Sequence, residues 1–230
     1  MMKNKIKIIG FDADDTLWVN EPFYRETEKQ FAHILSPYFA ENEINDELFK
    51  IEMQNLALYG YGAKSFILSM IETALRLSGN KITAIEISKI IEIGKVQLNL
   101  PVVLLDGVEL VLQKLHPNYK LILATKGDLL DQEQKLKKSG LINYFHHIEI
   151  MSDKHENNYK KLIKRLDIEP QDFVMIGNSI KSDILPVINI GAKAIHVPYH
   201  TTWQHENDHD ETDNSKFVTV DNLAEILNIL

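Results

Sequence analysis

The 230-residue sequence contains no cysteine, which excludes disulfide bonds, thiolate metal sites and a cysteine nucleophile. It also lacks any apolar run near the ~18 residues that a membrane helix requires. The apolar run within residues 3–11 is too short for the hydrophobic region of a signal peptide, and carboxylates follow it at once. These absences suit a reducing compartment and predict a cytoplasmic protein without a membrane partner.

Positive charge is in the minority, since 25 Lys and Arg side chains stand against 33 Asp and Glu, a net charge of −8. An acidic protein repels nucleic acid unless a local basic patch overrides the field, and the sequence shows no such patch. The 44% hydrophobic and 25% charged residues match ordinary globular proteins. We therefore expect a folded protein, monomeric or homodimeric, that does not bind nucleic acid.

Short apolar runs rich in β-branched residues alternate with stretches of helical pattern. The first run ends at Phe11, and later runs span residues 121–124, 148–150, 173–176 and 194–197. Helical stretches such as 129–139 and 158–166 separate them. This alternation predicts an α/β fold in which helices cover both faces of a doubly wound parallel sheet. Polar residues at the carboxyl ends of such strands line the binding crevice, so the chemistry is expected there.

The segment from residue 18 to about residue 100 has a different pattern, with helical stretches at 23–35, 46–57 and 65–77 and no strand. We predict that residues 1–17 and 101–230 form the core, and that residues 18–100 form a helical insertion. Tyr59-Gly60-Tyr61-Gly62 interrupts this insertion with a turn whose rings face either a substrate or the neighbouring helices.

Residues 201–215 are polar and rich in His, Asp and Glu. They are expected to form a long exposed loop before a strand at 217–220 and a terminal helix at 223–230. His200, His205 and His209 lie in or next to this loop at irregular spacing. We interpret them as solvated side chains rather than as a second metal site.

Three carboxylates in four residues, those of Asp12, Asp14 and Asp15, follow the first predicted strand directly. Such a cluster repels itself unless a cation or a reaction requires it, although a chance acidic turn has the same pattern. Carboxylates at positions i and i+2 of a loop can face the same pocket. One can then act as a nucleophile while the other exchanges a proton with the leaving group.

Polar residues also follow two later strands. Thr125 and Lys126 end the strand that begins at residue 121, where a hydroxyl and backbone N–H groups can hold phosphoryl oxygens. Lys154 follows the strand at 148–150, and its charge can neutralise an anionic nucleophile and a phosphoryl group. Taken singly, a threonine at a strand end is usually an ordinary cap, and Lys154 on its own would be a solvated surface lysine.

A fourth polar element follows the strand at 173–176. Asn178, Ser179 and Asp183 lie in this glycine-led segment and offer the hard oxygen atoms that Mg²⁺ prefers. Four such elements at the ends of successive strands indicate one site rather than four coincidences.

These elements resemble the haloacid dehalogenase superfamily, whose members have a Rossmann-like core and a helical cap inserted after the first strand. The resemblance covers essentially the whole chain. The family's Asp-x-Asp-x-Thr signature is matched by Asp12, Asp14 and Thr16. The family's later motifs are matched by Thr125, by Lys154 with Lys160 or Lys161 as alternatives, and by Asn178 with Asp183.

The resemblance implies a Mg²⁺-dependent phosphatase that hydrolyses a small phosphorylated substrate through an aspartyl-phosphate. Asp12 is then the nucleophile, and Asp14 is the general acid and base. The implied phosphate-binding residues are Thr125, Lys126 and Lys154. The implied Mg²⁺ ligands are Asp12, Asp14 and Asn178, with Thr16, Ser179 and Asp183 supporting them.

Asn178 departs from the family pattern, which usually has Gly-Asp where this chain has Gly177-Asn178. A neutral amide should bind Mg²⁺ more weakly than a carboxylate. The dehalogenases of this superfamily have a Ser-Asn pattern there and work without metal, so a 2-haloacid dehalogenase is an alternative. They lack the second carboxylate that Asp14 provides, which favours phosphate. A non-catalytic binder of a phosphorylated ligand is a further alternative, disfavoured because adjacent carboxylates repel an anion.

The motifs do not identify the substrate, because specificity in this fold resides in the cap. The candidates on the cap side are Asn20, Glu21, Tyr59, Tyr61 and Lys64. Their functional and packing interpretations both stay open.

Overall fold

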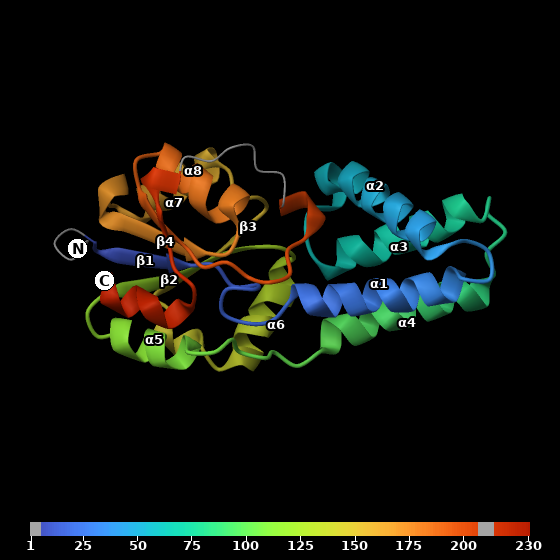
Figure 1. The fold of residues 1–230 in the computed structure, drawn as a ribbon, viewed down its shortest axis with the longest axis horizontal. Helices are drawn as coiled ribbons and strands as arrows, with labels where there is room; N and C mark the ends of the chain where they lie inside the picture. Colours follow the sequence, from blue (N-terminus) through green and yellow to red (C-terminus); the bar gives the residue numbers. More distant parts are fainter. Residues whose placement is uncertain (1–5, 207–213) are drawn as a thin grey trace. The chain divides into compact units, whose positions relative to one another are not determined.

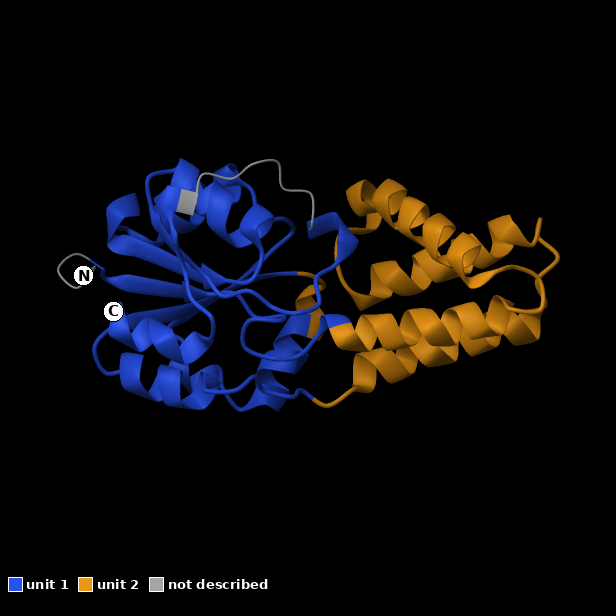
Figure 2. Ribbon diagram, viewed as in Figure 1, with its two compact units in different colours: residues 1–21, 102–126, 132–230 blue, residues 22–101, 127–131 orange. Residues whose placement is uncertain are grey.

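The structure is a computed structural model that describes residues 6–206 and 214–230. Contacts within the chain divide it into two compact units, which Figure 2 colours separately. The core unit comprises residues 1–21, 102–126 and 132–230, and the helical unit comprises residues 22–101 and 127–131. The helical unit begins at Pro22 rather than at Trp18, because Trp18 forms isolated β-bridges with Asp14 and Leu104 of the core unit.

A six-stranded sheet forms the centre of the core unit (Figure 1). Its strands are β1 (Ile8–Phe11), β2 (Lys120–Lys126), β3 (His147–Met151), β4 (Phe173–Gly177), β5 (Lys193–His196) and β6 (Val218–Thr219). The spatial order is β3-β2-β1-β4-β5-β6, and every pairing is parallel. Phe11 pairs with Leu123 on one side and with Ile176 on the other. Asp12 therefore leaves the carboxyl edge of the sheet between β2 and β4.

Alternate residues of β1 enter two separate hydrophobic cores, as the two-residue period of a strand requires. Ile9 and Phe11 face one core, and Ile8 faces the other. The first core is covered by α5 (Val108–Leu115) and α6 (Leu129–Ser139), and the second by α7 (Glu156–Leu166) and α8 (Leu185–Asn189). Figure 1 shows these helices on the two faces of the sheet. The predicted doubly wound α/β fold is confirmed.

The helical unit is built from α1 (Glu21–Leu35), α2 (Glu41–Tyr59), α3 (Ala63–Leu77) and α4 (Ala84–Asn99). The four helices share one hydrophobic core, to which each contributes side chains, for example Phe31, Ile44, Met70 and Ile90. Between α2 and α3, Gly60 and Gly62 have φ angles of 71° and 113°, which glycine adopts without steric strain. In the described part of the chain, none of the helices combines the length and hydropathy needed to cross a bilayer.

The C-terminal region differs from the sequence prediction. The terminal helix is a short 3-10 helix at Leu223–Asn228. The described part of the predicted loop contains another 3-10 helix at Gln204–Glu206, in which Glu206 is only 7% exposed. The expectation of an exposed loop is therefore wrong at Glu206, because its carboxylate has buried hydrogen-bond partners that compensate for lost water. His209 lies outside the described residues.

Candidate active site

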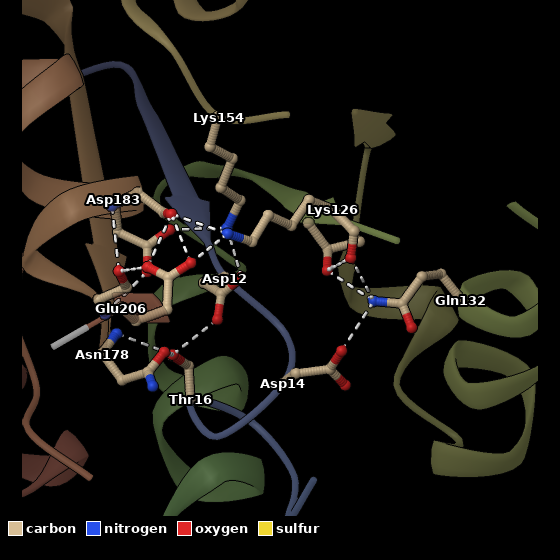
Figure 3. A network of polar contacts seen from close by, with 12 residues as sticks. Asp12, Asp14, Thr16, Lys126, Gln132, Lys154, Asn178, Asp183 and Glu206 are labelled. Atoms are coloured by element: carbon tan, nitrogen blue, oxygen red, sulfur yellow. Dashed lines mark hydrogen bonds and ion pairs between the residues drawn. The ribbon is translucent and has the colours of Figure 1, made fainter. Parts of the chain in front are cut away.

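Asp12, Lys154 and Asp183 form a buried charged cluster at the carboxyl edge of the sheet (Figure 3). They follow β1, β3 and β4 in the chain. The Lys154 ammonium donates to Asp12 Oδ1 and, at 2.6 Å, to Asp183 Oδ1. Asp12 is 6% exposed, Lys154 2% and Asp183 1%. The parallel topology thus brings together three residues that the sequence analysis took from separate strand ends.

The charges in this cluster depend on one another. Burial, together with the Asp183 carboxylate, raises the pKa of Asp12 to about 7, although Lys154 opposes the rise. Burial disfavours the ammonium of Lys154, but Asp12 and Asp183 raise its pKa well above the usual value. Lys154 is therefore a fixed cation beside the Asp12 carboxylate. A preorganised cation at this position can stabilise negative charge that develops near Asp12.

The turn after β4 holds Asp183 in place. The Ser179 N–H donates to Asp183 Oδ2 at 3.0 Å, and the Ser182 N–H donates to Ser179 Oγ at 3.0 Å. Residues Ile180–Ile184 form a single π-helical turn, a feature frequent at functional sites. A Cβ atom on Gly177 would overlap the Asp183 carboxylate, so this close approach requires glycine.

Thr16 connects the loop after β1 to the turn after β4. Its hydroxyl donates to Asp12 Oδ2 at 3.0 Å and lies 3.2 Å from Asn178 Oδ1, while the Asn178 N–H donates to the hydroxyl at 3.1 Å. Side-chain oxygens of Asp12 and Asn178 thus both lie within hydrogen-bonding distance of the Thr16 hydroxyl. Among residues 6–206 and 214–230, no group of three or more His, Cys, Asp or Glu side chains is arranged to hold a metal ion. Carboxylate and amide oxygens are nevertheless hard donors of the kind that Mg²⁺ takes, together with backbone carbonyls and water.

Asp14 has a separate set of partners. Trp18 Nε1 donates to Asp14 Oδ1 at 2.7 Å, and Lys135 Nζ donates to the same oxygen at 3.0 Å. Gln132 Nε2 donates to Asp14 Oδ2 at 3.1 Å and to Thr125 Oγ1 at 2.7 Å. The Asp14 side chain is 24% exposed. Side chains of α6 therefore orient the Asp14 carboxylate, which stays partly exposed to solvent.

Asp15, the third carboxylate of the motif, has a structural role. Its backbone has a φ angle of 59°, and its carboxylate accepts the N–H groups of Asn20 at 2.8 Å and Glu21 at 3.0 Å. Burial raises the pKa of Asp15 to about 7. These hydrogen bonds satisfy the backbone at the start of α1, in the manner of a helix cap. Asp15 thus fixes the linker that leads from the Asp12 loop to α1.

The two predicted phosphate-binding residues of β2 have different surroundings. Thr125 is 1% exposed, and its hydroxyl accepts the hydrogen bond from Gln132. Lys126 pairs with Glu206 and donates to Ser182 Oγ at 2.9 Å. The ammonium of Lys126 therefore balances a carboxylate of the chain itself.

The other lysine candidates and the cap-side candidates have partners of their own. Lys160 and Lys161, the alternatives to Lys154, are both exposed, and Lys160 Nζ lies 3.7 Å from Glu156 Oε2. Within the helical unit, the Tyr59 hydroxyl donates to Glu72 at 2.9 Å, and Lys64 pairs with Asp128 at 2.8 Å. Tyr61 is partly buried. Asn20 and Glu21 belong to the core unit, and Asn20 Oδ1 accepts from Lys135 at 2.8 Å.

Sequence reasoning missed three charged or polar residues of this site. Gln132 and Lys135 are three positions apart on α6 and so lie on one face of the helix, next to Asp14. Their spacing of three residues could have suggested a shared polar face, but only weakly and only after a helix had been predicted behind the second strand. Glu206 gave no signal, because it is one acid among many in a polar segment.

Comparison with known proteins assigns the chain to a family. A family model of haloacid dehalogenase-like hydrolases matches residues 6–191, and the protein belongs to this family of hydrolytic enzymes. The crystal structure of a haloacid dehalogenase-like family hydrolase from Xanthomonas campestris is similar over 97% of this chain and 90% of that chain. The two chains are 38% identical, and the TM-score is 0.86. The resemblance inferred from the motifs is confirmed.

Two curated relatives are phosphatases. N-acylneuraminate-9-phosphatase of Mus musculus is 30% identical over 97 residues, which cover 40% of this chain and 39% of that protein. Glyceraldehyde 3-phosphate phosphatase of Methanothermobacter thermautotrophicus is 27% identical over 118 residues, 49% of this chain and 51% of that protein. The chain thus spans about half or less of the length of the curated relatives that it matches.

Proposed function

We propose that the protein is a Mg²⁺-dependent phosphatase that hydrolyses a small phosphate monoester through an aspartyl-phosphate on Asp12. The observation that carries the proposal is the cluster at the carboxyl edge of the sheet, where a buried carboxylate lies against the fixed ammonium of Lys154. A second carboxylate, that of Asp14, lies two residues further on. The phosphatase relatives support the choice of phosphate as the group transferred.

In the first step, a carboxylate oxygen of Asp12 attacks phosphorus in line with the ester oxygen. A P–O bond to Asp12 forms as the ester P–O bond breaks, and Asp14 gives its proton to the departing oxygen. Lys154 stabilises the charge on the transferring oxygens, and Thr125 orients them. The product of this step is an alcohol and an aspartyl-phosphate.

In the second step, Asp14 takes a proton from a water molecule that attacks the same phosphorus atom. The P–O bond to Asp12 breaks, inorganic phosphate leaves and both carboxylates return to their starting state. Asp12, Asn178 and the backbone carbonyl of Asp14 are the groups that would hold Mg²⁺. When bound, the ion supplies positive charge for the phosphate oxygens.

A panel of candidate substrates tests this function. Purified protein is incubated with 4-nitrophenyl phosphate, glyceraldehyde 3-phosphate, N-acylneuraminate 9-phosphate, other sugar phosphates, nucleotides and phosphorylated acids, with Mg²⁺ or with EDTA. We expect phosphate release that requires Mg²⁺. Asp12→Asn should lower kcat by about 10³-fold or more because an amide is not a nucleophile, whereas Asp221→Asn makes the same change at an exposed position and should leave kcat unchanged.

The same panel separates the alternatives. Chloride release from 2-chloropropionate without metal, and no phosphate release, would identify a dehalogenase instead. Binding of phosphorylated compounds without turnover would identify a non-catalytic binder. Phosphatase activity retained by Asp12→Asn, in protein free of host phosphatase, would reject Asp12 as the nucleophile.

A further inference from the structure

Glu206 lies in none of the motifs that define the site, yet it is buried beside it (Figure 3). We propose that Glu206 is a positioning residue, which ties Lys126 on β2 to the turn that carries Asn178 and Asp183. The proposal rests on the phosphatase function proposed above. It assigns a role in the reaction to the 3-10 helix at Gln204–Glu206, which the motifs leave unexplained.

Together, the two carboxylate oxygens of Glu206 accept hydrogen bonds from the ends of two different strands. Oε1 accepts from the ammonium of Lys126, which also donates to Ser182 Oγ at 2.9 Å. Oε2 accepts from the hydroxyls of Ser179 and, at 2.9 Å, Ser182. One side chain thus joins the end of β2 to the turn after β4.

This junction continues to the nucleophile through side chains already described. Ser179 and Ser182, which bind Glu206, also hold each other, and the Ser179 N–H fixes Asp183. Asp183 in turn accepts from Lys154 at 2.6 Å, and Lys154 donates to Asp12. Loss of the Glu206 carboxylate should therefore loosen the Ser179–Ser182 turn and let Lys154 drift from the Asp12 carboxylate.

The charge of Glu206, and not only its volume, is required for this arrangement. Burial favours the neutral acid, but Lys126 and the hydrogen bonds from Ser179 and Ser182 lower the pKa of Glu206 to about 2. A buried pair of charges contributes little net stability compared with an apolar pair of the same size. The presence of the pair here is better explained by the geometry that it fixes.

Steady-state kinetics with 4-nitrophenyl phosphate at saturating Mg²⁺ test the proposal. We expect Glu206→Gln to lower kcat by about 10- to 100-fold, because a misplacement of catalytic groups by about 1 Å can cost about 10²-fold in rate. KM should stay within about twofold, as expected for a residue that acts through other side chains and not on the substrate itself. Glu206→Asp, which keeps the carboxylate, should lose less than Glu206→Gln. Glu109→Gln, which removes an exposed carboxylate on α5, is the matched control and should change neither constant.

A double-mutant cycle separates positioning from a general loss of structure. Lys126→Met should also lower kcat, and the double variant Lys126→Met/Glu206→Gln should lose little more than the worse single variant, because both break one unit. Losses that add would overturn the proposal. So would a Glu206→Gln enzyme with kcat within twofold of wild type. A rise in KM alone would show instead that Glu206 contacts the substrate. Tighter binding of inorganic phosphate by Glu206→Gln would show that the Glu206 carboxylate competes with phosphate for Lys126. Either result would overturn the proposal.

Hydrogen–deuterium exchange provides a measurement that does not need activity. Glu206→Gln should accelerate exchange of the Ser182 and Asp183 amides, which the turn protects through hydrogen bonds to Ser179, while the amides of β1 keep their wild-type rates. Unchanged exchange in the turn would overturn the proposal. A wild type without phosphatase activity would reject the proposed function, and exchange would still decide whether Glu206 holds the turn. Should Glu206→Gln not fold, Ser182→Ala tests the same junction by kinetics and exchange.

Discussion

Replacement of Lys154 by methionine perturbs the site at its centre, because methionine fills a similar volume but carries no charge. The change leaves Asp12 and Asp183, which share the ammonium, without their cation. Removing one partner of a buried ion pair costs about 3–5 kcal/mol, since the remaining charge is neither solvated nor paired. Both carboxylates are less than 10% exposed, so the full range applies.

The loss of stability should depend on pH, and the pKa of Asp12 determines its direction. This pKa is raised from 3.8 to about 7 in the folded protein, so the stabilisation from its protonation is complete below pH 3.8 and is lost as pH rises towards 7. At pH 5 the wild-type Asp12 is therefore already mostly neutral. Removal of Lys154 then costs mainly the ion pair with Asp183. At pH 8 the wild-type Asp12 is ionised. Because Lys154 opposes the rise of the Asp12 pKa, the variant must either keep an unpaired buried carboxylate or take up a proton, and both cost free energy. The cost of Lys154→Met should accordingly be greater at pH 8 than at pH 5.

Urea unfolding in EDTA, followed by tryptophan fluorescence, to which the buried Trp18 contributes, measures this difference at both pH values. Lys160→Met is the matched control, because Lys160 is exposed and its pairing with Glu156 is a surface one. It should change the free energy of unfolding by no more than about 0.5 kcal/mol. A cost for Lys154→Met below about 1 kcal/mol, or the same cost at both pH values, would refute the reasoning.

Two further substitutions test the metal site and the helical unit. Asn178→Asp adds a carboxylate at a proposed ligand position, so the Mg²⁺ concentration at half-maximal activity should fall about five- to tenfold; an equal or higher requirement would show that the Asn178 amide is not a ligand. Changing both Tyr59 and Tyr61 to Ala should lower kcat/KM at least about tenfold for the best panel substrate and less than about twofold for 4-nitrophenyl phosphate, which reaches few cap residues. Equal losses on both substrates would make them packing residues, in line with the contact between Tyr59 and Glu72.

The sheet could be predicted from the sequence because its central strands, β1, β2 and β4, are almost entirely buried. Such strands are continuous apolar runs, and each ends at a polar residue where the chain reaches the solvent. The run at 121–124 lies within β2 (Lys120–Lys126), and that at 173–176 lies within β4. The boundary of the helical unit is harder to predict, since the sequence does not show that Trp18 pairs with Leu104 and so belongs to the core unit.

Candidate site residues could be predicted where a strand end places them, and not where tertiary contacts do. Asp12, Lys154 and Asp183 each follow a strand closely, and parallel strands end at one edge of the sheet. Lys135 meets Asp14 only through the packing of α6, and Glu206 reaches Lys126 from a distant segment without a regular pattern. Local periodicity contains no information on such contacts.

Ion pairing within the site bears on the proposed requirement for a metal ion. Three lysines around the candidate site are each paired with carboxylates: Lys154 with Asp12 and Asp183, Lys135 with Asp14, and Lys126 with Glu206. An arriving phosphate would have to compete with these carboxylates for every one of those ammonium groups. A divalent cation held by Asp12 and Asn178 would supply the missing positive charge without breaking any pair. The neutral amide of Asn178 would weaken the ion's binding but would also repel phosphate less than a carboxylate at that position. A metal requirement at a raised Mg²⁺ concentration is therefore the outcome that these pairings favour.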